Sequence, residues 1–148
     1  MAWKFRAWFR NRMLYNDFTI TPDGKAVLNG RTGKLMASTN LRDCDGREIY
    51  EGDIVVDVER ILDSGNAWGI VTMNPGKWIS TMITGNPDAF CYGDFLDLVD
   101  KGRIRVVGNI YENPDTLMTL KRWIVRAPDR VTREESLPEI IRIINNPP

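Results

Sequence analysis

The chain begins with a short segment in which apolar and basic side chains alternate. From Trp3 to Ala7, every second residue is apolar and the residues between are lysine and arginine. A period of two predicts a half-buried strand, because successive side chains point to opposite faces of a sheet. In this arrangement the basic residues form a solvated face. The apolar pair Trp8 and Phe9 breaks the alternation, which indicates a bulge or the end of the strand.

Further along, short β-rich runs alternate with turn residues. Asp-Gly pairs at residues 23–24 and 45–46 predict two hairpins, and Asn-Pro-Gly at residues 74–76 predicts a third. The strands expected around these turns are Thr19–Thr21, Ala26–Leu28, Leu41, Ile49, Trp68–Met73 and Lys77–Ile83. Ile54–Val58 and Arg103–Tyr111 add two more. Roughly seven strands at about ten-residue spacing predict a small antiparallel barrel or sandwich.

Two segments leave the secondary structure open. Phe90–Val99 fits a short helix or a strand starting near Phe95, and Leu117–Arg126 fits a last strand or a short helix. The polar stretch from Ala127 to Arg133 suggests a linker. We therefore expect a β domain over residues 1–120, followed by a strand or linker over residues 121–135.

The C-terminal segment has a helical pattern. Ser136 and Glu139 have the spacing of a capping box, and Pro138 is tolerated in a first turn. These signals predict a short amphipathic helix over residues 136–146. Its apolar residues recur at i, i+3, i+4 and i+7, which places them on one face. That candidate docking face consists of Leu137, Ile140, Ile141 and Ile144. It packs either on the same chain or on a partner.

Composition narrows the possible functions. The 148 residues carry 20 basic and 20 acidic side chains, so there is no global charge that would attract nucleic acid or anionic membrane. There is no histidine, the commonest acid–base group and metal ligand. The two cysteines, Cys44 and Cys91, are expected to be reduced thiols. No apolar run approaches the roughly 20 residues of a membrane-spanning helix, and we expect a cytoplasmic protein without cofactors.

Three segments carry distinctive motifs. They are Lys4–Trp8 (KFRAW), Leu41–Val55 (LRDCDGREIYEGDIV) and Val107–Pro114 (VGNIYENP). In this order and spacing they resemble the YopX family of phage and prophage proteins. The resemblance frames residues 4 to about 118 and implies a compact β-barrel core of the SH3 type. Because the members of this family are mostly uncharacterised, it implies no catalytic residues.

The acidic residues of the middle motif suggest a metal site, which the spacing does not support. A calcium loop with Gly46 at its invariant glycine needs ligands where Leu41 and Gly52 stand. A metal-dependent enzyme that uses Glu51 and Asp53 remains an alternative, although no catalytic signature accompanies them. Turn and strand formation explains most of this motif. Its candidate surface residues are Tyr50, Glu51 and Asp53.

The first twelve residues suggest nucleic-acid binding, because basic and aromatic side chains are interleaved there without an acid. The candidate contacts are Lys4, Arg6, Trp8, Phe9, Arg10 and Arg12. The simpler interpretation is a first strand with core aromatics and solvated basic residues. The leading hypothesis is a non-enzymatic phage accessory protein that binds a host or phage protein, with self-association as a variant of this hypothesis. Nucleic-acid binding is the alternative.

Overall fold

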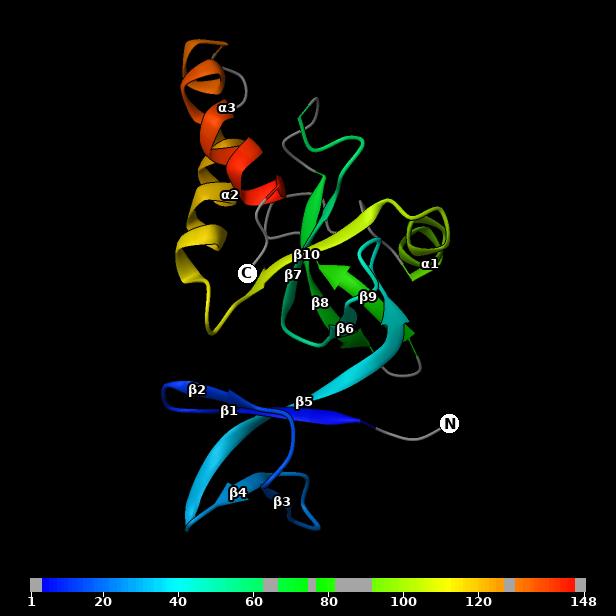
Figure 1. Ribbon diagram of the computed structural model, residues 1–148, viewed down its shortest axis with the longest axis vertical. Helices are drawn as coiled ribbons and strands as arrows, with labels where there is room; N and C mark the ends of the chain where they lie inside the picture. Colours follow the sequence, from blue (N-terminus) through cyan, green and yellow to red (C-terminus); the bar gives the residue numbers. More distant parts are fainter. Residues whose placement is uncertain (1–3, 63–66, 75–76, 82–91, 127–129, 146–148) are drawn as a thin grey trace.

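Two antiparallel sheets and three helices make up the fold. The computed structural model describes residues 4–62, 67–74, 77–81, 92–126 and 130–145. Over these residues the chain forms ten strands, and the protein is mainly β, as the sequence predicts. The first sheet lies at the lower end of Figure 1, and the second sheet lies at the upper end with the helices around it.

The first sheet has the order β2-β1-β5-β4-β3, and β6 pairs with the far end of β5. Its strands are β1 (Phe5–Phe9), β2 (Arg12–Leu14), β3 (Thr19–Ile20), β4 (Ala26–Leu28), β5 (Arg31–Arg42) and β6 (Glu48–Tyr50). The Asp-Gly hairpins occur where the sequence predicts them. At Gly46 the backbone has a φ of 80°, a conformation that glycine adopts without a Cβ clash.

The second sheet has the order β10-β7-β8-β9 and is covered by helices on both faces. Its strands are β7 (Asp53–Asp57), β8 (Trp68–Asn74), β9 (Lys77–Thr81) and β10 (Ile104–Asn109). The helices are α1 (Tyr92–Asp100), α2 (Pro114–Arg126) and α3 (Arg130–Asn145). The turn between β8 and β9 lies outside the described residues.

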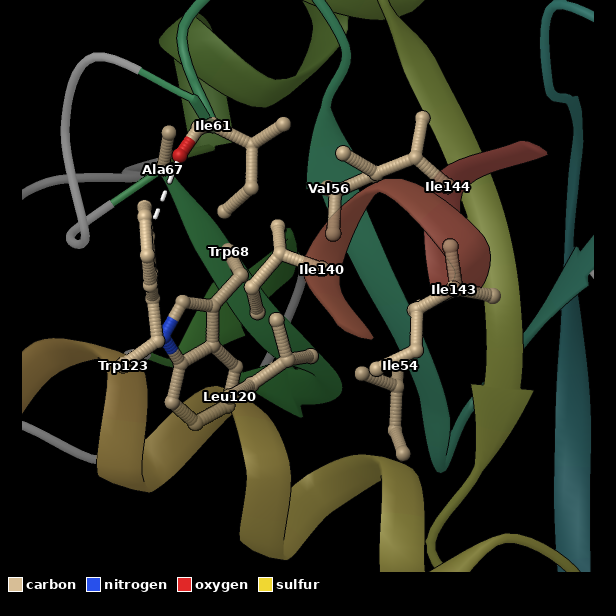
Figure 2. Packing of buried hydrophobic residues seen from close by; sticks show 11 residues of the cluster. Ile54, Val56, Ile61, Ala67, Trp68, Leu120, Trp123, Ile140, Ile143 and Ile144 are labelled. Carbon is tan, nitrogen blue, oxygen red and sulfur yellow. Dashed lines mark hydrogen bonds between the residues drawn. The ribbon is translucent and has the colours of Figure 1, made fainter. Parts of the chain in front are cut away.

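The main core lies between the second sheet, α2 and α3, as Figure 2 shows. Alternate residues of β7 point to opposite faces, so Ile54 and Val56 join this core. The indole N–H of Trp123 donates to the carbonyl of Ile61 at 3.2 Å. On the other face, Val55 packs in a second cluster with Phe95 of α1. Because both faces of β7 are buried, its sequence is an uninterrupted apolar run between two aspartates.

Several expectations differ from the structure. The strand pairings of the described residues close neither sheet on itself, so the SH3-like barrel is not confirmed. The expectation of a strand or linker over residues 121–135 is wrong, because α2 continues to Arg126 and α3 begins at Arg130. Pro138 therefore lies inside α3 and not in its first turn. Packing against the sheet and α2 maintains the helix despite the N–H that proline lacks.

The helical alternative holds for both ambiguous segments, as α1 and α2. Within the described residues, no helix combines the length and apolar character that crossing a membrane requires. Cys44 is exposed with a free thiol, and Cys91 lies outside the described residues.

Candidate functional site

A buried ion pair joins the first strand to the middle motif. The guanidinium of Arg6 donates to the carboxylate of Asp53 at 2.8 Å and to the carbonyl of Glu51 at 3.2 Å. Arg6 is 3% exposed, so the expectation of a solvated basic face on β1 is wrong for this residue. Its side of the strand faces β7, and the nearby carboxylate compensates for the loss of hydration.

Asp53 and Tyr50 complete the environment of Arg6. The backbone N–H of Tyr50 donates to the second oxygen of Asp53 at 2.8 Å, so both carboxylate oxygens are occupied. Burial raises the pKa of Asp53 to about 6, and the positive charge of Arg6 opposes this increase. The guanidinium carbon lies 4.7 Å from the centre of the Tyr50 ring, a cation–π geometry. These contacts fix the middle motif against β1.

Asp43 holds the hairpin of the middle motif in place. One of its oxygens accepts the backbone N–H groups of Asp45 and Arg47, at 2.9 and 2.8 Å. The other accepts the N–H of Val106, in the second sheet, at 2.9 Å. Since this carboxylate is 7% exposed and its acceptors are used by backbone groups, its role is to stabilise the fold.

The third motif builds a turn and the start of α2. The side-chain oxygen of Asn109 accepts the N–H groups of Tyr111 and Glu112, at 3.0 and 2.8 Å. Asn113 accepts the N–H of Asn109 and precedes Pro114, the first residue of α2. Asparagine before a helix and proline at its first position are both favoured at helix starts. Local hydrogen bonding therefore explains this motif too.

The three motifs meet in space although they are far apart in the sequence. Trp8 stacks on Tyr111, with ring centres 5.9 Å apart and planes inclined by 24°. The N–H of Ile110 donates to the carbonyl of Gly52 at 3.0 Å. Together with the Arg6–Asp53 pair, these contacts link each motif to the other two.

An open cleft of about 570 Å³, which we call the central cleft, lies where the motifs converge. Its lining combines charges of both signs with two tyrosines and two side-chain amides. The lining residues are Arg6, Tyr15, Arg47, Glu48, Tyr50, Asp53, Val106, Gly108, Asn109, Glu112 and Asn113. Tyr15 is 55% exposed and packs edge-on against Tyr50, with ring centres 5.7 Å apart.

The described lining of the central cleft offers charged groups, hydroxyl groups and side-chain amides. As far as the structure describes the chain, this lining contains no serine, threonine, cysteine or lysine. Burial raises the pKa of the Tyr50 hydroxyl, which also hydrogen-bonds to Glu48. Among the described residues, no three side chains of the His, Cys, Asp or Glu type are grouped to hold a metal ion. The carboxylate of Asp53, proposed for the metal-dependent alternative, is already bound by Arg6 and by backbone.

The remaining candidate residues of the first strand separate into two groups. Lys4 forms an ion pair with Glu48 at 3.2 Å, and Phe9 is buried beside Phe18. Arg10 and Arg12 are exposed and line a different hollow with Arg31. Sequence reasoning missed Tyr15 and Arg31, because no local pattern connects them to the motifs, and it did not single out Arg47 although this residue lies within the middle motif.

The candidate face of the C-terminal helix packs mainly within the same chain. Ile140 and Ile144 are buried in the main core, and Leu137 packs against it. Ile141 is 40% exposed, and Ile143 contributes to the core in its place. The expected face therefore differs by one residue from the observed one.

The fold and the central cleft define a class: a mainly β protein with two sheets and a polar cleft formed by three separated motifs. The model of the YopX protein family matches residues 9–118, and the chain belongs to this family. The first motif lies just before the matched region. The chain is also similar to the crystal structure of protein EF1440 from Enterococcus faecalis, with 26% identity and a TM-score of 0.54. That similarity covers 79% of this chain and 99% of the other. No curated protein matches the chain.

Proposed function

We propose that the protein is a non-enzymatic recognition module that binds a segment of another protein in the central cleft. The observation that carries this proposal is Tyr15. Its ring is more than half exposed, yet the edge contact with Tyr50 holds it at the rim of the cleft. A rigid, amphipathic aromatic side chain of this kind provides contact area at a low entropic cost.

The composition of the cleft supports a polypeptide ligand. Tyrosine and arginine dominate the residues that contribute most to protein–protein affinity. Glu48 and Glu112 accompany Arg47 in the lining, so both signs of charge are available to a mixed partner. Because the lining carries both signs of charge, it complements a polar peptide of mixed charge better than it complements a polyanion.

The cellular setting follows from the family resemblance. We place the module in the host cytoplasm as an accessory protein of a phage or prophage, with a host or phage protein as its partner. Self-association through the same cleft is a second form of this proposal. The SH3-like character of the core belongs to the proposal as well, since both sheets are small and antiparallel.

The test is site-specific cross-linking in bacterial cells that carry the gene. A photoreactive benzoylphenylalanine replaces Tyr15 in one variant and Ile20 in another. Ile20 is a matched control, because it is 45% exposed but does not line the central cleft. We expect a discrete protein adduct from position 15 and none from position 20, as identified by mass spectrometry.

A second variant, Tyr15→Ala, then shows whether the captured protein binds through the cleft. Affinity of the purified partner should fall at least tenfold, while Ile20→Ala leaves it unchanged. An adduct to a second copy of the chain supports the self-associating form. Identical adducts from both positions, or a partner whose affinity is unaffected by Tyr15→Ala, would overturn the proposal.

A further inference from the structure

Three arginines gather at the end of the first sheet that lies away from the second sheet. Arg10 and Arg12 belong to the hairpin between β1 and β2, and Arg31 begins β5 after the turn from β4. The antiparallel register pairs Trp8 with Lys34, which brings both turns to one end of the sheet. All three arginines line an open hollow of about 790 Å³, which we call the basic hollow.

The arginines of the basic hollow differ from the other arginines whose contacts the structure describes. Arg6 and Arg103 each bind a buried aspartate, and Arg105 binds Asp45. In the described part of the chain, no hydrogen bond or ion pair engages the guanidinium groups of the basic hollow. Among the residues that the structure describes, no acidic residue lines it, although Asp17 lines a neighbouring hollow. Three hydrated cations are therefore available to one ligand.

The charge of the whole chain is distributed unevenly around this region. Residues 1–37 contain seven basic and two acidic residues, whereas the rest of the chain contains thirteen basic and eighteen acidic ones. Although the formal net charge of the chain is zero, residues 1–37 are net positive and the rest of the chain is net negative. A positive end on a neutral protein orients an approaching polyanion toward that end.

We propose that the basic hollow binds the sugar–phosphate backbone of a nucleic acid. Guanidinium groups bind phosphate oxygens in a bidentate geometry, and the amides of Asn11 and Asn29 add neutral donors beside them. The hollow is open and lies across two hairpin turns, a shape suited to a polymer rather than to an enclosed phosphate monoester.

Recognition here excludes base stacking. Phe9 is the aromatic residue of the hollow, and it is 8% exposed. Its ring packs over Gly33 so closely that a Cβ added there would lie 2.7 Å from the ring. Because the faces of this ring are covered by the sheet, bases have no platform, and binding depends on phosphates alone. The nucleic-acid surface therefore consists of Arg10, Arg12 and Arg31, and not of Lys4, Arg6 and Trp8.

The test measures fluorescence anisotropy with a labelled 20-base-pair DNA duplex of mixed sequence, and with one of its strands alone. The full chain is titrated at several KCl concentrations between 20 and 200 mM. Three neutralised phosphates predict a slope of about −3 for log K against log salt concentration. The duplex should bind at least as well as the single strand, since stacking contributes nothing.

The decisive variant combines Arg10→Asn, Arg12→Gln and Arg31→Gln. Asparagine is chosen at position 10 because it tolerates the φ of 54° found there. The control combines Lys101→Gln, Arg122→Gln and Arg142→Gln. It removes the same number of positive charges from exposed residues outside the first sheet. Thermal unfolding confirms that both variants are folded. We expect the first variant to lose at least tenfold in affinity at 20 mM KCl and the control to stay within twofold.

Three outcomes would overturn the proposal. They are the absence of binding at 20 mM KCl, an equal loss in both variants, and a slope near zero. Polyglutamate that competes as well as the duplex at equal charge would indicate an acidic protein ligand and would also reject nucleic-acid recognition. Because Tyr15 does not line the basic hollow, these results are independent of the cross-linking test of the central cleft.

Discussion

Arg6 and Arg31 lie on neighbouring strands of one sheet, but their surroundings are opposite. Arg6 is buried between Asp53 and the ring of Tyr50, while Arg31 is exposed at the basic hollow without a partner among the described residues. The same contrast separates the motifs from the turns at the end of the first sheet. Polar groups of the motifs bind backbone and each other, so they stabilise the fold. Those of the basic hollow remain available for a ligand.

The largest expected effect comes from removing the buried guanidinium. Arg6→Met leaves the carboxylate of Asp53 buried without its cation, which should lower the free energy of unfolding by about 3 kcal/mol at neutral pH. Urea unfolding monitored by tryptophan fluorescence measures the change. Arg31→Met is the control, and it should alter the stability by less than about 0.5 kcal/mol. Equal losses of stability in the two variants would contradict the proposed difference between the buried Arg6 and the exposed Arg31.

The effect of Arg6→Met should depend on pH. The folded-state pKa of Asp53, raised to about 6, lies above its ordinary value of 3.8. Between these values the folded state holds a proton that the unfolded state lacks, so this group's contribution to stability decreases as pH rises. Without Arg6 the pKa of Asp53 increases further. The loss caused by the substitution should therefore be larger at pH 7.5 than at pH 5, and an equal loss would refute this mechanism.

A smaller effect distinguishes two aspartates of the same hairpin. Asp43→Asn turns a donor toward the N–H of Val106, and we expect a loss of about 2 kcal/mol. Asp45→Asn removes an ion pair with Arg105 that is partly exposed to solvent, and its cost should be below about 1 kcal/mol. Chemical denaturation of both variants provides the comparison. A reversed order would mean that the surface pair matters more than the buried acceptor.

The smallest effect has the opposite sign. Arg10 adopts a φ of 54°, which costs a non-glycine residue about 1–2 kcal/mol. Arg10→Gly relieves this cost but increases the entropy of the unfolded chain by up to about 1 kcal/mol. We expect a net gain of about 0.5 kcal/mol in unfolding free energy. Arg12→Gly, at an ordinary strand conformation, should instead destabilise the protein. A loss from both variants would show that Arg10 contributes contacts.

Local chemistry was predictable from the sequence, and long-range pairing was not. The Asp45-Gly46 turn and the strand β7 follow from neighbouring residues, so the patterns predict them well. The burial of Arg6 depends on Asp53, 47 positions away, and an alternating pattern alone assigns Arg6 to solvent. Arg31 joins Arg10 and Arg12 only through the pairing of β5 with β1. No local signal reports that pairing.

The C-terminal region shows how a local signal can mislead. Ser136 and Glu139 have capping-box spacing, yet the chain is already helical from Arg130. A capping box shows which side chains can satisfy the N–H groups at the start of a helix. Here the burial of Ile140, Ile143 and Ile144 stabilises a longer helix than this local pattern predicts. The family resemblance rests on three motifs, and their convergence became visible only in the structure, where several of their residues contact one another.

The continuity of β5 determines how the gene can be divided. Residues 31–37 of this strand pair with β4 and β1, and residues 38–42 carry the pairing with β6. A fragment that starts at residue 38 would lose Arg6 and Tyr15 from the central cleft and would expose a new strand edge prone to aggregation. A fragment that ends there would lack the carboxylate of Asp53. A division at residue 38 therefore separates the two halves of the central cleft, whereas the described lining of the basic hollow lies entirely within residues 1–37.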